Sequence, residues 1–146
     1  MKNILAAVDF SPGTRRVVTC AVAQARAFSA RLWLVHVAAP EPDFVPHVAD
    51  PPVMRDQVAA GLREEHRHIQ ALAAEVADEG VEVTPLLIAG ATVEKILSEA
   101  EEVDADLVVA GTHGHGAFHR ALLGSVSEGL VRHARVPLLI VPVGKA

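Results

Sequence analysis

The chain alternates short apolar runs with longer segments in which apolar residues recur every three or four positions. Five runs are almost continuously apolar, which is typical of strands buried on both faces of a parallel sheet. They cover residues 4–8, 32–37, 81–88, 106–110 and 138–141. Four intervening segments have the spacing of helices with one buried face, and they cover residues 12–28, 53–79, 92–102 and 125–133.

This alternation predicts an α/β fold, a single doubly wound five-stranded parallel sheet with helices on both faces. The reason is that right-handed crossovers place successive helices over the sheet. We expect the strand order 3-2-1-4-5, counted along the chain, with the first strand in the centre. The length of 146 residues suits one domain with one substantial core.

Turn-forming residues mark the expected ends of the first two helices. Ser11 suits the N-cap of the first helix and Pro12 its first helical position, while Gly80 is a natural stop for the second. Apolar residues at helical spacing are expected to face the sheet. They include Val18, Ala21, Ala25 and Phe28 in the first helix and Leu62, Ile69, Leu72 and Val76 in the second.

A glycine-dense segment, residues 111–124, connects the fourth predicted strand to the fourth predicted helix. Glycines let backbone N–H groups approach an anion closely, and a helix N-terminus adds a favourable dipole. Doubly wound sheets also bind ligands beyond the carboxyl ends of their strands, where the strand order reverses. The segment therefore predicts a phosphate site, with the ends of strands one and two as the other walls.

Other interpretations of this segment are weaker. Its glycines never form a Gly-x-Gly-x-x-Gly dinucleotide fingerprint, and no Gly-Lys-Ser/Thr marks a P-loop. A plain flexible connection remains an alternative. His113, His115 and His119 suggest a metal, but no acidic residue stands among them to assist, so we favour histidines near an anion.

Two further side chains have a structural and a functional interpretation. Asp9 ends the first strand, where it would cap the turn before the first helix or accept hydrogen bonds from a sugar or a base. Ser125 would be an N-cap, or its hydroxyl and N–H would bind a terminal phosphate. A catalytic site is poorly supported, because neither a nucleophile elbow nor a lysine or acidic pair accompanies the glycine segment.

Composition excludes several classes of partner. The formal charge is −5, with 13 basic and 18 acidic residues, which argues against a nucleic-acid surface. The single cysteine, Cys20, excludes a disulfide within the chain. No apolar stretch approaches the ~18 residues of a membrane span, and the first residues do not look like a signal peptide, so we expect no membrane partner and a cytoplasmic location.

The last strand, 138–141, is expected at a sheet edge, which favours pairing with a second copy.

The chain resembles the universal stress protein family. The resemblance rests on Gly111-x2-Gly114-x9-Gly124-Ser125, on the first residues 4–11 and on the apolar runs 34–37 and 133–141. It implies a nucleotide-binding domain over residues 1–146, a regulatory stress-response protein that binds ATP, with Mg²⁺ or Mn²⁺, and forms a homodimer through Leu138–Val141. Its chemistry is expected to be slow or absent. A slow ATPase or phosphotransferase, and a nucleotide-free interaction module, are the alternatives.

The resemblance also implies roles for individual residues. Asp9 and Val37 would hold the nucleoside, with the Val37 backbone at the adenine edge and Ala7 shaping the adenine pocket. Gly111 and Gly114 would line the ribose and phosphates, and the remaining residues would bind the phosphate tail: Gly124, Ser125 and Val126. The family often has a fixed cation at positions 113 and 115. His113 and His115 stand there instead, so phosphate affinity is expected to be lower or to depend on pH.

Overall fold

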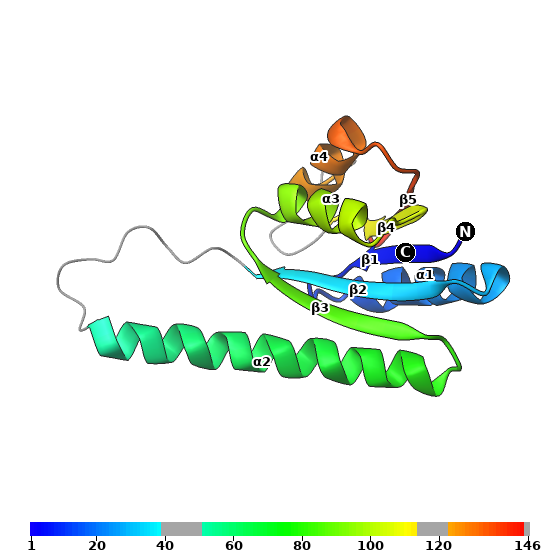
Figure 1. Ribbon diagram of the computed structural model, residues 1–146. Helices are drawn as coiled ribbons and strands as arrows, with labels where there is room; N and C mark the ends of the chain where they lie inside the picture. The colour runs from blue at the N-terminus through cyan, green and yellow to red at the C-terminus, as the bar shows by residue number, and fades with distance from the viewer. Residues whose placement is uncertain (39–50, 114–122, 145–146) are drawn as a thin grey trace.

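The computed structural model describes residues 1–38, 51–113 and 123–144, and for residues 51–58 it describes the backbone. In these residues five parallel strands form one sheet with two helices on each face (Figure 1). The strands are β1 (Asn3–Ala7), β2 (Arg31–Ala38), β3 (Val83–Ala89), β4 (Leu107–Gly111) and β5 (Leu138–Val141). The helices are α1 (Thr14–Phe28), α2 (Pro51–Asp78), α3 (Thr92–Glu102) and α4 (Ser125–His133). The predicted α/β fold is confirmed.

The strand order is β3-β2-β1-β4-β5, as predicted. The first strand lies in the centre, since Ile4 is opposite Leu32 of β2 and Leu107 of β4. At the carboxyl ends of the strands, β1 stops at Ala7, opposite Val35, whereas β2 continues to Ala38. The edge of the sheet is therefore recessed at β1.

Side chains of the central strand alternate between two apolar layers. Ile4 and Ala6 are fully buried among residues of α1 and α2, and Leu5 is fully buried among residues of α3 and α4. In the neighbouring strand Val109 and Val108 divide between the same two layers. Because both faces are covered, these strands need apolar residues at every position, which explains the continuous runs in the sequence.

The first helix begins later than the sequence predicts. It starts at Thr14 with Gly13 as N-cap, so the assignments of Ser11 as N-cap and Pro12 as first helical residue are wrong. The Asp9 carboxylate accepts a hydrogen bond from the Ser11 N–H (3.0 Å) and lies 3.3 Å from the Thr14 hydroxyl. This side chain stabilises a separate turn before the helix, and the turn contains Ser11 and Pro12.

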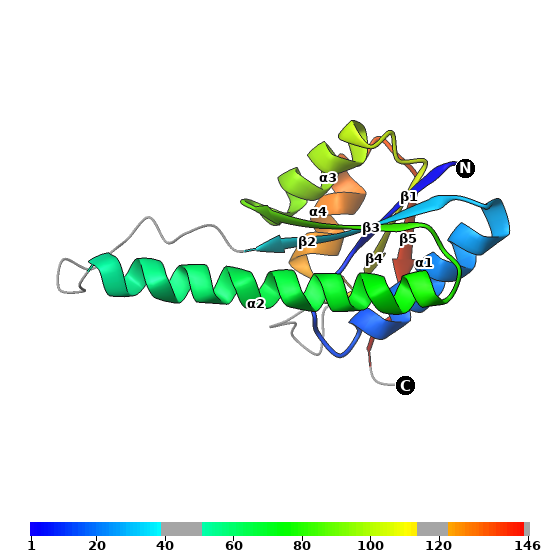
Figure 2. The same cartoon turned by 60° about the horizontal axis from the view of Figure 1, so that its bottom comes forward.

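The long helix α2 extends past the sheet that it covers. Its 28 residues span about 42 Å, whereas the eight residues of β2 span about 26 Å. Figures 1 and 2 show the amino-terminal part of α2 projecting beyond the strands. Leu62, which we expected to face the sheet, is 37% exposed for this reason, whereas Ile69 and Val76 are buried. The helix ends before Gly80, whose φ of +84° favours glycine.

Candidate functional site

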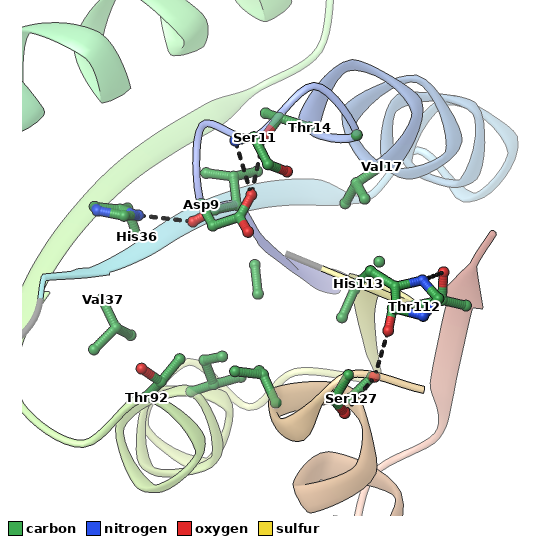
Figure 3. Close-up of a pocket in the computed structure, with 18 of the residues that line it drawn as sticks. Asp9, Ser11, Thr14, Val17, His36, Val37, Thr92, Thr112, His113 and Ser127 are labelled. Atoms are coloured by element: carbon green, nitrogen blue, oxygen red, sulfur yellow. Dashed lines mark hydrogen bonds between the residues drawn. The ribbon is translucent and has the colours of Figure 1, made fainter. Parts of the chain in front are cut away.

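A cavity of about 420 Å³ opens at the carboxyl ends of β1, β2 and β4 (Figure 3). Its walls come from the end of β1, the end of β2, the segment after β4, and the amino-terminal ends of α1, α3 and α4. Of the nine residues expected to bind the nucleotide, seven line it: Ala7, Asp9, Val37, Gly111, Gly124, Ser125 and Val126. His113, also singled out in the sequence, lines it as well. Gly114 and His115 lie outside the described residues. The roles of all nine in binding stay predictions.

Asp9 stands at the point where the chain leaves β1 for α1. Its carboxylate stabilises the turn described above, which is the structural role that the sequence allowed for it. The next residue, Phe10, has a φ of +60°, so the chain bends sharply directly after Asp9. The bend leaves Asp9 in the cavity wall, and Figure 3 shows its side chain between Ser11 and the cavity.

His36 is a buried polar residue in β2 whose role the sequence analysis did not recognise. The residue is 8% exposed, and Nδ1 of its ring lies 2.8 Å from the carbonyl oxygen of Val8. On the other side of the ring, Nε2 lies 3.5 Å from a carboxylate oxygen of Glu65 in α2, and the Phe10 ring centroid is 4.5 Å away. His36 therefore holds the ends of β1 and β2 against α2. A histidine inside an apolar run was the available signal.

Thr112 makes hydrogen bonds that close the base of the glycine segment. Its carbonyl oxygen accepts a bond from the Gly124 N–H (2.6 Å) and lies 2.8 Å from the Ser127 hydroxyl. Its own N–H donates to the Val141 carbonyl of β5 (2.9 Å), and its hydroxyl accepts from the Val143 N–H (3.2 Å). The two ends of the segment are thus joined to each other and to the sheet. From the sequence alone, neither Thr112 nor Ser127 stood out.

The amino-terminal end of α4 supplies backbone donors at the cavity wall. The N-cap is Gly124, so the N-cap interpretation of Ser125 is wrong by one residue. Among the residues that the structure describes, no side chain caps this end, and the first intrahelical bond runs from the Glu128 N–H to the Gly124 carbonyl (2.9 Å). The N–H groups of residues 125–127 therefore have no carbonyl of their own helix to bond. Such a helix end attracts anions, and a phosphate fits both its charge and its donors.

The described lining of the cavity holds few groups for catalysis. Within it there is no lysine or arginine, and its acidic side chain is that of Asp9. The described residues also contain no group of three or more His, Cys, Asp or Glu side chains placed to hold a metal ion. None of the helices in the described segments is both long enough and apolar enough to cross a membrane.

Known proteins resemble this chain in sequence and in fold. A universal stress protein of Thermus aquaticus is 36% identical over 142 residues, covering 96% of this chain and 98% of that protein. The universal stress protein UspA of Lactobacillus plantarum has a similar structure, with a TM-score of 0.84 at 24% identity, covering 96% of this chain and 97% of that one.

Two further structures of similar fold contain nucleotides. A universal stress protein in complex with cAMP has a TM-score of 0.66 at 26% identity, covering 98% of both chains. A universal stress protein of Archaeoglobus fulgidus in complex with dAMP has a TM-score of 0.70 at 22% identity, covering 97% of this chain and 98% of that one. The model of the universal stress protein family itself matches residues 1–142. On that match, over almost its whole length, the chain belongs to the universal stress protein family.

Proposed function

We propose that this protein binds an adenine nucleotide, ATP in the first place, and acts as a regulatory module rather than as an enzyme. The observation that carries the proposal is the pairing, in one cavity, of a helix end whose backbone donors have no acceptor in their own helix with an apolar wall that includes Ala7 and Val37. The first suits phosphates, and the second suits a base. The similar proteins that were solved with cAMP and dAMP support the same class of ligand.

The backbone of Val37 is suited to recognise the edge of a base. Hydrogen bonds in β2 alternate between its two neighbours: Val35 accepts from Val8 on the β1 side, and Ala38 accepts from Gly90 on the β3 side. By this alternation the N–H and carbonyl of Val37 face the β1 side, two residues beyond Val35. Since β1 ends opposite Val35, the sheet offers them no partner there. One donor and one acceptor side by side match the donor and acceptor of the adenine edge.

The other proposed contacts to the nucleotide follow in order along the cavity, from the base at β2 to the phosphates at α4. Asp9 would accept hydrogen bonds from the ribose, and Gly111 would let the backbone approach it. The N–H groups of Gly124, Ser125 and Val126 would surround the phosphate tail, with Mg²⁺ or Mn²⁺ accompanying it. Gly114 and His115, by family resemblance, would complete the phosphate side.

Calorimetry with Mg-ATP tests the proposal, with Ser125→Asp as the diagnostic variant and Ser125→Asn as its uncharged control. An added carboxylate at the start of α4 interacts favourably with the helix dipole, so it does not destabilise the helix, but it repels phosphate. At an effective dielectric of about 20, repulsion over a few ångströms weakens ATP binding about tenfold or more. The asparagine variant should bind nearly as the wild type does. A wild-type protein that binds none of ATP, ADP and AMP would refute the proposal.

The same preparation separates this function from its alternatives. Steady release of inorganic phosphate from bound ATP would identify an ATPase, and transfer of the γ-phosphate to another molecule would identify a phosphotransferase. Mass spectrometry of the ligand released from the purified protein adds an independent observation. Absence of any nucleotide there, together with no binding in calorimetry, would favour a module that acts through protein contacts.

We also propose that two copies pair through β5. This strand lies at one edge of the sheet and carries Leu138–Val141, four apolar residues. An open edge of this kind invites pairing, and burying its side chains recovers ~25 cal/mol per Å² of apolar surface. Ile140→Lys would place a charge at the contact twice, because a two-fold interface repeats each residue. Sedimentation should show a dimer for the wild type and for Val131→Lys, an exposed site on α4, and a monomer for Ile140→Lys. A monomeric wild type at micromolar concentration would contradict this proposal.

A further inference from the structure

We propose that Ser127 is a positioning residue, whose hydroxyl holds the first turn of α4 in the orientation that binds phosphate. The inference rests on the proposed nucleotide site and adds to it a residue that touches no ligand through its side chain. The observation behind it is the place of Ser127 in the structure. The residue is 2% exposed, and it is one of two buried polar residues in the described part of the chain.

The buried position of Ser127 calls for an explanation. It lies one helical turn before Leu130, which is fully buried, so an apolar side chain would suit the same face of α4. Serine is also a weak helix former, because its hydroxyl competes for backbone hydrogen bonds. A buried hydroxyl must in addition find a partner. The residue is therefore unfavourable for the helix alone, and its hydrogen bonds show what it contributes.

The Ser127 hydroxyl lies 2.8 Å from the carbonyl oxygen of Thr112 and 3.0 Å from that of Gly124. Its single proton is committed to these two acceptors, so the side chain has no proton left for a phosphate. Thr112 directly follows β4, and Gly124 is the N-cap of α4, so the two residues lie at opposite ends of the glycine segment. The hydroxyl thus joins both ends of the segment at one point (Figure 3).

This bond adds a second attachment between α4 and the sheet. The first is the Gly124 N–H bond to the same Thr112 carbonyl (2.6 Å). With one hydrogen bond at the N-cap the first turn of α4 has more freedom to shift, whereas a second bond from within that turn restricts it, in addition to the packing of Leu130. Thr112 in turn is held by Val141 of β5 and by Val143. The N–H groups at the start of α4 therefore keep a fixed position relative to Gly111 across the cavity.

The expected signature is a loss of affinity that depends on the phosphates. Removing the hydroxyl in Ser127→Ala should lower the affinity for ATP about tenfold and change the affinity for adenosine less than about twofold, because adenosine does not reach α4. Ser127→Thr keeps a hydroxyl that can reach a carbonyl one turn back, and it should restore most of the ATP affinity. If Ser127 contributed to the stability of the fold alone, Ser127→Ala would lower the affinities for ATP and for adenosine by the same factor.

Calorimetric titration of the wild type and both variants with Mg-ATP and with adenosine gives the ratio of the two affinities. Thr19→Ala is the matched control, because the exposed Thr19 hydroxyl bonds the Arg15 carbonyl (2.8 Å) in α1, away from the cavity. It should leave the ratio unchanged. The inference is overturned if the ratio in Ser127→Ala equals that of the wild type, or if Ser127→Thr loses ATP affinity as the alanine variant does. A wild type that binds neither ligand would refute the proposed function and this inference together, whereas a wild type that binds ATP with an unchanged ratio in Ser127→Ala would refute the inference alone.

Discussion

Replacing Gly129 with alanine would place a methyl group in the contact between α3 and α4, whose amino-terminal ends both line the cavity. The new Cβ would lie 2.7 Å from Cγ2 of Val93 and 3.3 Å from its Cγ1. Val93 is β-branched and stands in the first turn of α3, so its rotamer is stiff and its methyl groups cannot swing away cheaply. One helix must move relative to the other.

Two opposing terms set the expected change in stability. Overpacking of this kind costs about 1–3 kcal/mol, and alanine in place of glycine inside a helix gains about 1 kcal/mol. We therefore expect Gly129→Ala to lower the free energy of unfolding by about 1 kcal/mol. In a Val93→Ala background the nearest remaining atom is the Cβ of residue 93, at an ordinary 3.5 Å. There the same substitution should raise the free energy of unfolding by about 1 kcal/mol.

Urea denaturation of the wild type, both single variants and the double variant measures the coupling, expected at about 2 kcal/mol. Gly61→Ala in α2 is the matched control, because a Cβ at Gly61 would meet no atom within 4 Å. It should stabilise the protein by about 1 kcal/mol through helix propensity alone. If Gly129→Ala stabilises the wild type as much as Gly61→Ala does, the close approach of the two helices is refuted.

Two further predictions concern the rest of the sheet. The Asp106 carboxylate accepts backbone bonds from the N–H groups of Asn3 (3.0 Å) and Lys2 (2.6 Å), which lower its pKa below the ordinary 3.8. The ionised carboxylate therefore stabilises the folded protein above that ordinary value, and this stabilisation is lost as the pH falls towards the lower folded-state pKa. Asp106→Asn should flatten the fall of Tm with acid below about pH 4. Parallel curves of Tm against pH for both proteins would contradict this. Ile69→Ala, at a position in α2 that is 1% exposed, should lower the free energy of unfolding, measured by urea denaturation, by about 2–5 kcal/mol. Arg67→Ala, on the exposed face of α2, should change it little. Similar values for the two variants would mean that Ile69 does not anchor α2 to the sheet.

The fold could be predicted because its signal is repeated along the whole chain. Each strand is an apolar run and each helix an amphipathic segment, so errors at single positions do not change the alternation. Apart from the exposed Leu62 in α2, the errors arose at the ends of helices. At Ser11 and Pro12 the Asp9 carboxylate accepts a hydrogen bond from the Ser11 N–H, and the Thr14 N–H bonds the Ser11 carbonyl oxygen (3.0 Å), so a separate turn precedes the helix. Phe28, expected to be buried, is 47% exposed because α1 ends there and Ser29 turns the chain away in a left-handed conformation.

The candidate site was predictable where its residues form a local pattern. The spacing of the glycines and Ser125 is such a pattern, and so is the position of Asp9 directly after an apolar run. Thr112 and Ser127 carry no comparable signal, because their partners are distant in sequence or lie on the backbone, and His36 carries only that of a histidine inside an apolar run. A threonine that bonds Val141 and Val143 looks, in one sequence, like any other threonine. Such residues become visible when the sheet brings their partners together.

The central place of β1 also governs the order in which the protein can assemble. Leu107, the partner of Ile4 in β4, is synthesised long after β1 and β2, so the first strand emerges well before its second neighbour. Closing such a long loop is slow compared with pairing β2 and β3, which one crossover connects. The cavity lies between early and late strands and is therefore complete in the fully formed sheet. A ligand held there stabilises contacts made at the end of folding, so it should slow unfolding and leave the rate of folding almost unchanged.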